Sequence, residues 1–189
     1  NPELIFTRGG ALNSRSNDFG INALVIHEMP ISLGGYNTHG LTQKICDAYY
    51  MNDGTDVPGK DSEMNGGDGS ERLTGWTTRN DVRNGKYPEL TTKALTPVSL
   101  QYVHREPRFY ASVAYSGSLW ECLDDPTAGN RNKQIFYYRN GGNGWMNNFS
   151  FLRTGIGCKK YYNPYDYANT GSYGDYSHLR TKWEPAIRF

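Results

Sequence analysis

Hydrophobic and polar residues alternate along one stretch of this chain, "EPRFYASVAYSGSLW" at 106–120. From residue 108 the alternation has the period of two that is typical of a β-strand with one buried face. Its apolar face would carry Phe109, Ala111, Val113 and Tyr115. Two aromatic segments flanked by Gly, Asn or Pro, "KQIFYYR" (133–139) and "GCKKYYN" (157–163), predict further strands. The three strands could form a small antiparallel sheet.

Apolar residues recur at helical spacing in "LTQKICDAYYMNDG", which predicts a helix over about 42–52 with Gly54 as a left-handed cap. The recurring positions are Leu41, Ile45, Ala48 and Tyr49. A second short helix is predicted between Thr96, the N-cap, and Pro107, where the helix would stop. Pro185 would open a helix close to the end of the chain.

Three long polar stretches separate these elements, at 59–90, 140–150 and 163–176, and each contains large aromatic rings. Loops of this length are uncommon in compact domains unless they have a function. Hydrophobic residues make up 37% of the chain, so a globular core is possible. The 15 tyrosines and a mean hydropathy of −0.73 indicate that many rings can lie half in water. Such a surface suits polar ligands.

Charge and hydropathy exclude two classes of partner. The net charge is +1 and the basic residues form no runs, so we expect no binding to nucleic acid. No stretch approaches the roughly 18 apolar residues of a membrane span. The chain begins without Met and ends soon after Pro185, so we expect residues 1–189 to be a single segment of a longer protein.

The cysteines show no metal or redox spacing, because Cys46, Cys122 and Cys158 lie far apart. We expect buried free thiols. One disulfide with one free thiol is the alternative.

A phosphate-binding loop is nearly matched by "GTDVPGKD", with Gly54, Gly59 and Lys60 at the required spacing. Asp61, however, stands where a Ser or Thr hydroxyl would hold magnesium, and its carboxylate would repel phosphate. We therefore reject this site.

A zinc site is suggested by "HEMPISLGGYNTH", which opens with His27 and contains His39. A zinc-protease helix needs its second histidine where Ile31 stands, and Pro30 would interrupt that helix. We predict that His27 is an ordinary packed or hydrogen-bonded histidine.

Paired carboxylates for glycoside hydrolysis could come from Asp124 with Asp125, or from Asp166 with Asp175. Their neighbours are turn residues, which favours a role for these Asp side chains as turn formers. We therefore predict a protein that is not an enzyme and uses no cofactor or metal.

The aromatic loops remain as the possible binding site. A sugar ring has an apolar face that a flat aromatic ring can cover and a belt of hydroxyls that Asn, Asp or Arg can bind. Trp76 in "TGWTTRND", Trp145 in "GGNGWMNN" and Tyr36 with Asn37 in "LGGYNTH" have this setting. Alternatively, each ring packs down and holds its own loop.

Three segments in order along the chain resemble the SusD/RagB family of outer-membrane nutrient-binding lipoproteins. They are "LTQKICDAYYMNDGTD" (41–56), "REPRFYASVAYSGSLW" (105–120) and "KWEPAIRF" (182–189). The second departs from the family pattern at Glu106, where Asp is usual, and the change keeps the charge.

The resemblance implies a mainly α SusD-like fold, of which this chain would be a loop-rich segment with short helices and a small antiparallel sheet. It would lack the N-terminal helical-repeat half, with its tetratricopeptide-like helix pairs, and the last C-terminal helices. The resemblance also implies a lipid-anchored protein on the outer-membrane surface that captures oligosaccharides or polysaccharides for a SusC-like TonB-dependent transporter. Peptide capture for a RagB-type importer is the alternative.

Family binding residues lie on variable loops, so none is transferred to this chain. The strand at 108–116 is then expected to be scaffold, with Phe109, Val113 and Tyr115 packed inward. Arg105, Glu106 and Arg108 would anchor the turn before it through charged hydrogen bonds. Trp120, beyond the Gly117 turn, completes the predicted carbohydrate-binding set of Trp76, Trp145, Tyr36, Asn37 and Trp120.

Overall fold

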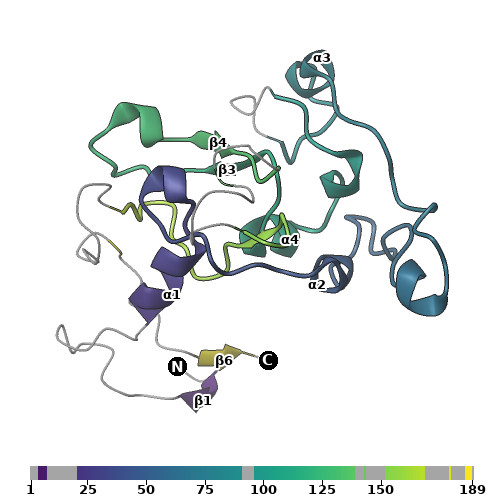
Figure 1. The fold of residues 1–189 in the computed structure, drawn as a ribbon, viewed down its shortest axis with the longest axis horizontal. Coiled ribbons are helices and arrows are strands. Elements are labelled where there is room, and N and C mark those ends of the chain that lie inside the picture. Colours follow the sequence, from purple (N-terminus) through teal and green to yellow (C-terminus); the bar gives the residue numbers. More distant parts are fainter. Residues whose placement is uncertain are drawn as a thin grey trace.

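The structure of the protein is a computed structural model that describes residues 4–7, 21–90, 96–138, 143, 152–168, 179 and 186–188. At 4–7, 21–23 and 186–188 the description covers the backbone alone. The helices and strands are short, and they are joined by long loops (Figure 1). The described helices are α1 (Ile21–Glu28), α2 (Gln43–Asp47), α3 (Arg79–Arg83) and α4 (Pro107–Ser112). Short 3-10 turns lie at Ile31–Leu33, Ser62–Asn65, Leu100–Tyr102 and Ala128–Asn130.

The described strands form antiparallel pairs. β2 (Val113–Ala114) pairs with β5 (Gly157–Cys158), and β3 (Ser118–Trp120) pairs with β4 (Lys133–Ile135). The predicted strands at 133–139 and 157–163 are thus confirmed, although both are shorter than predicted. They do not join one sheet with the segment at 108–116, because β2–β5 and β3–β4 are separate two-stranded pairs.

β1 (Leu4–Thr7) and β6 (Ala186–Arg188) form the remaining pair, in which Phe6 lies opposite Ile187. The helix predicted to open at Pro185 is therefore wrong for the residues that follow it. Aromatic and β-branched residues such as Phe6 and Ile187 fit a strand pair well.

The alternating segment at 108–116 was predicted as one strand and is instead a helix followed by a short strand. Pro107 occupies the first turn of α4, where its missing N–H costs nothing and its fixed φ suits a helix. Phe109 and Val113 are buried, whereas Ala111 is exposed, so burial follows the i,i+4 spacing of a helix and not a period of two. The sequence pattern fitted both periods, and the proline decides for the helix.

The two predicted helices are shorter than expected. Thr42 caps α2, since its Oγ1 accepts a hydrogen bond from the Ile45 N–H at 3.4 Å, but the helix ends at Asp47 and not near residue 52. Gly54 has a left-handed φ of 84°, but in a separate turn beyond the helix. Between Thr96 and Pro107 only the 3-10 turn at Leu100–Tyr102 forms, so the predicted helix there is wrong.

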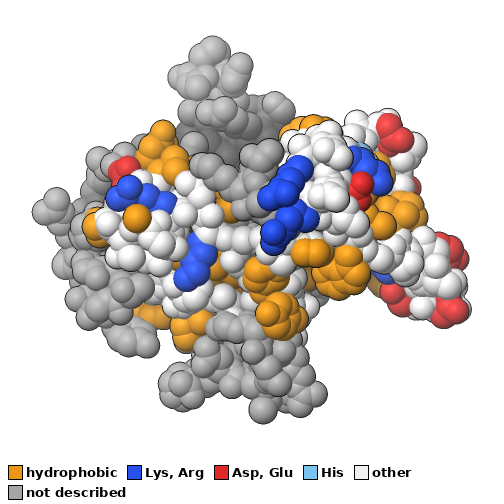
Figure 2. All heavy atoms as spheres, turned by 90° about the horizontal axis from the view of Figure 1, so that it is seen from above, with side chains coloured by type: hydrophobic (Ala, Val, Ile, Leu, Met, Phe, Trp, Pro, Cys, Tyr) orange, Lys and Arg blue, Asp and Glu red, His pale blue; other side chains and the backbone are white. Residues whose placement is uncertain are grey.

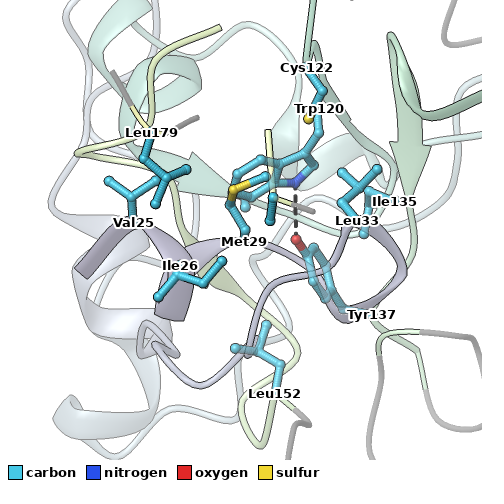
Figure 3. Close-up of a cluster of buried hydrophobic side chains, with 12 residues drawn as sticks. Val25, Ile26, Met29, Leu33, Trp120, Cys122, Ile135, Tyr137, Leu152 and Leu179 are labelled. Atoms are coloured by element: carbon cyan, nitrogen blue, oxygen red, sulfur yellow. Dashed lines mark hydrogen bonds between the residues drawn. The ribbon is translucent and has the colours of Figure 1, made fainter. Parts of the chain in front are cut away.

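Buried side chains form two clusters. The first surrounds Trp120, whose indole N–H donates a hydrogen bond of 3.1 Å to the Tyr137 hydroxyl (Figure 3). Met29 and Val25 of the α1 segment pack against it (Figure 3). The second cluster contains Phe109, with Val113 and other residues on both sides of α4. The inward packing predicted for Phe109, Val113 and Tyr115 is confirmed, since all three are buried in this second cluster.

Arg105 and Glu106 join two of the three segments that carried the family resemblance, 41–56 and 105–120. The buried guanidinium of Arg105 donates hydrogen bonds to the carbonyls of Cys46, in the last turn of α2, and of Tyr49, just beyond the helix. The Glu106 carboxylate accepts the Tyr50 N–H at 3.1 Å. It also forms an ion pair of 2.8 Å with Arg108, so the predicted anchoring through charged hydrogen bonds is confirmed.

All three cysteines are free thiols, Cys46 and Cys122 buried and Cys158 half-buried. Burial raises the pKa of Cys46 to about 12 and that of Cys122 to about 11, which leaves both thiols protonated and unreactive at neutral pH.

Candidate functional site

Trp76 is the predicted site residue that the structure places in solvent, with 65% of its surface exposed. Its backbone forms an antiparallel bridge with Ser99. The next residue, Thr77, is 1% exposed, donates its N–H to the Val98 carbonyl at 2.9 Å and accepts the Val98 N–H on its hydroxyl at 3.0 Å. Because neighbouring side chains of an extended chain point to opposite sides, burial of Thr77 directs the Trp76 indole outward.

Helix α3 begins directly after this bridge. Thr78 caps it, since its hydroxyl accepts the Asp81 N–H at 3.1 Å while the Asp81 carboxylate accepts the Thr78 N–H at 3.3 Å. This reciprocal capping box satisfies two backbone N–H groups that a helix otherwise leaves unpaired. It fixes the position of Arg79, the first residue of the helix, relative to Trp76.

Arg79 and Arg83 are exposed side chains of α3 and stand four residues apart, so they lie on the same side of the helix. Val82, on another side, is buried in the second cluster. Asp81, the acidic residue of the helix, is bound to Thr78 and lies 3.6 Å from Lys86. Among the described residues neither Arg79 nor Arg83 forms an ion pair.

Our sequence analysis did not predict these arginines as site residues. The signal that could have revealed them is "TTRNDVR", in which a Thr-x-x-Asp capping box starts a helix with arginines at i and i+4, next to Trp76.

Tyr36 and Asn37 lie on a different part of the molecule from Trp76. Tyr36 is half-buried, packs on the first cluster and meets the His27 ring edge-on at 4.9 Å. Asn37 is 1% exposed and donates a hydrogen bond of 2.7 Å to the Asn143 carbonyl. Asn143 in turn accepts the Ser32 N–H at 3.0 Å. Asn37 thus serves to fasten one loop to another, and a glycan cannot reach its side chain in this structure.

Trp120 is fully buried, which overturns its place in the predicted site. The Tyr162 ring meets it edge-on at 4.6 Å, and the Lys159 ammonium lies 5.3 Å from its ring centroid. A stacking platform needs at least one ring face open to the ligand, and Trp120 has none, so it is a core residue. Trp145 lies outside the described residues.

The polar motifs rejected in the sequence have structural partners of their own. Lys60, from the phosphate-loop match, pairs with Asp56 at 2.5 Å, and His27 hydrogen-bonds the Thr38 hydroxyl at 2.7 Å. Asp125 accepts the Thr127 N–H at 2.8 Å and Asp166 accepts the Asn163 N–H at 3.0 Å, so both are turn formers, as predicted. Within the described ranges no group of three or more His, Cys, Asp or Glu side chains could hold a metal ion.

Across the part of the chain that the structure describes, none of the helices has the length and apolar character needed to cross a membrane. No curated protein and no solved structure matches this sequence. A family model, described as the SusD family, matches residues 2–189, which is all but the first residue. The chain therefore belongs to the SusD family.

Proposed function

We propose that this protein captures oligosaccharides at the bacterial cell surface and delivers them, chemically unchanged, to a SusC-like TonB-dependent transporter. The SusD family comprises surface proteins that bind glycans and other nutrients and are not enzymes. Within this chain, the observation that carries the proposal is the exposed indole of Trp76. Its backbone is held by the bridge to Ser99, so the ring is presented without a large loss of entropy on binding.

Stacking on Trp76 supplies the apolar half of sugar recognition. The C–H face of a pyranose covers the ring, and polar groups around it can bind the hydroxyls. Thr78 and Asn80 lie within four residues of Trp76, and both are exposed. The segment therefore offers the two kinds of contact that a sugar requires.

The proposal extends to the whole protein. We place it on the outer membrane through a lipid anchor outside residues 1–189, which would form one segment of a mainly α domain with tetratricopeptide-like helix pairs. Trp145 and the half-buried Tyr36 remain secondary contacts in this proposal, whereas Asn37 and Trp120 are left out because both are buried.

Calorimetric titration of the full-length protein with a panel of oligosaccharides tests the site. Trp76→Ala should weaken glycan binding by about 1–3 kcal/mol, the range measured for aromatic rings that stack on nucleobases. Trp76→Tyr should retain most of the affinity, because it keeps a flat ring.

Met64→Ala is the matched control, since Met64 is also 65% exposed but offers no ring. Equal affinity of the Trp76→Ala and Met64→Ala variants for a bound glycan would show that the site lies elsewhere. Binding of peptides and of no glycan would favour peptide capture for a RagB-type importer instead.

A further inference from the structure

We infer that the surface next to Trp76 selects an acidic glycan, with Arg79 and Arg83 binding the carboxylate or sulfate of the sugar that stacks on the indole. The inference rests on the proposed function, because it specifies the class of ligand that the Trp76 site would take. It concerns one continuous stretch, residues 76–83. The bridge to Ser99 holds the backbone at Trp76, and the capping box of α3 holds it just before Arg79.

The first step is the spacing of the two arginines. On a helix, side chains at i and i+4 are neighbours, and like charges at this spacing repel and destabilise the helix. Helix α3 is five residues long and nevertheless carries Arg79 and Arg83 at this spacing. An anion placed between the two guanidinium groups would relieve the repulsion and accept charged hydrogen bonds from both of them.

The second step is the absence of a competing acid. Both oxygens of Asp81, the one acidic residue within α3, are engaged: Oδ2 by the Thr78 hydroxyl at 2.8 Å and Oδ1 by Lys86 at 3.6 Å. Arg72 shows the contrast, since it is clamped between Asp47 and Glu63 at 2.8 and 2.9 Å and has no capacity left for a ligand. Arg79 and Arg83 have no such partner among the described residues.

The third step is geometry. Trp76 and Arg79 are three residues apart, so their Cα atoms can be separated by at most about 11 Å. A hexuronic acid carries its carboxylate at the edge of the ring, in the plane of the sugar and away from the stacked face. In the arrangement that we propose, Trp76 covers the face of the sugar and the arginines meet its edge.

The surface view agrees with this arrangement. Figure 2 looks onto the side of the molecule where α3 lies at the top of Figure 1. Lys and Arg side chains lie beside hydrophobic ones in the middle of this view, and Asp and Glu side chains lie mostly in its right-hand part, some of them next to Lys or Arg (Figure 2).

The test compares acidic and neutral oligosaccharides on the full-length protein by calorimetric titration. The acidic probes are oligogalacturonate, oligoalginate and chondroitin sulfate oligomers. The neutral probes are methyl-esterified oligogalacturonate, which keeps the same backbone, together with malto-, xylo- and manno-oligosaccharides. We expect an acidic probe to bind, and the double variant Arg79→Gln with Arg83→Gln to weaken it by about tenfold or more. Raising the salt concentration should weaken wild-type binding and have little effect on the double variant.

Lys44→Gln is the control, because it removes an exposed positive charge from α2, at a distance from α3 (Figure 1). If neutral probes bind, lose affinity in Trp76→Ala and are unaffected by the double arginine variant, the acidic-glycan inference is overturned while the proposed function stands. Acidic binding that does not depend on the arginines also overturns the inference. If no probe of either class binds, both the inference and the glycan-capture proposal fail.

Discussion

Glu28 is a buried carboxyl group at the last residue of α1, 3% exposed. Burial raises its pKa from 4.5 to about 7, although a hydrogen bond from the Cys158 thiol, another from the Tyr161 N–H at 3.2 Å, and the charge of Lys160 act in the opposite direction. The negative end of the α1 dipole also disfavours a charge there. Glu28 is therefore largely protonated in the folded protein under mildly acidic conditions.

Stability should fall as the pH rises through this range. The unfolded carboxyl loses its proton near its ordinary pKa, whereas the folded one keeps its proton up to about pH 7. The stabilisation is complete below the unfolded pKa and is lost progressively up to the folded pKa, by about 3 kcal/mol in total. Urea denaturation between pH 5 and pH 8 measures this fall in the free energy of unfolding. The Glu28→Gln variant should show a flatter pH profile and exceed the wild type in stability at pH 8; parallel profiles for the two proteins would contradict the assignment.

The local sequence does not distinguish the exposed Trp76 from the buried Trp120. Both follow a glycine within three residues and stand among small polar residues. Trp120 is buried because the hydroxyl of Tyr137, two residues after β4, accepts its indole N–H and Tyr162 covers its ring. Those partners are distant in sequence, so local pattern could not separate the core tryptophan from the exposed one.

Among the elements, α3 has the clearest local cause, and it carries the proposed anion site. A five-residue helix is marginal alone, and its capping box contributes much of its local stability. Thr78→Ala removes the hydroxyl that accepts the Asp81 N–H, which should lower the free energy of unfolding by about 1 kcal/mol. Thr78→Ser keeps a hydroxyl and should be close to wild type.

Thermal unfolding compares these two variants, and titration with the bound glycan shows whether fraying of α3 also costs affinity. A Thr78→Ser variant as unstable as Thr78→Ala would mean that the methyl group and not the cap matters. Loss of stability without any loss of glycan affinity would show that glycan binding does not depend on an intact α3.

Element prediction succeeded where a residue type fixes the local backbone and failed where two periods compete. Thr42 was correctly located near the start of α2, and β4 and β5 were found from their aromatic and flanking residues. The segment at 108–116 fitted a strand by alternation, and Pro107, which we interpreted as the stop of a preceding helix, instead opens α4. At the end of α2, Arg105 binds the carbonyls of Cys46 and Tyr49 from 56 to 59 residues away, and no local pattern contains that contact.

At the scale of the whole molecule, two of the three segments that carried the family resemblance, 41–56 and 105–120, are in contact in space. The backbone around Tyr50–Asn52 runs beside that of 104–106, through the Asn52 N–H to His104 carbonyl hydrogen bond of 2.7 Å and the Glu106 N–H to Tyr50 carbonyl bond of 3.0 Å. Arg105 lies at the centre of this junction, with its guanidinium carbon 4.3 Å from the centroid of the Phe109 ring. These two segments of the family signature thus form a structural joint.

Arg105 should therefore be among the most sensitive positions for stability. Its guanidinium, 3% exposed as a residue, donates to the carbonyls of Cys46, Tyr49 and Gln101. Burial lowers its pKa, yet an arginine remains charged, so these carbonyls bind a buried cation. Arg105→Met leaves those carbonyls without their charged donor and should reduce the free energy of unfolding by about 3 kcal/mol or more. Arg105→Lys keeps the charge but not the forked guanidinium group and should recover only part of the loss.

Arg108→Gln is the control, since Arg108 is 72% exposed and its ion pair with Glu106 should contribute less than about 1 kcal/mol. Urea denaturation of the full-length protein distinguishes them, and equal midpoints for the Arg105→Met and Arg108→Gln variants would show that the joint does not depend on Arg105.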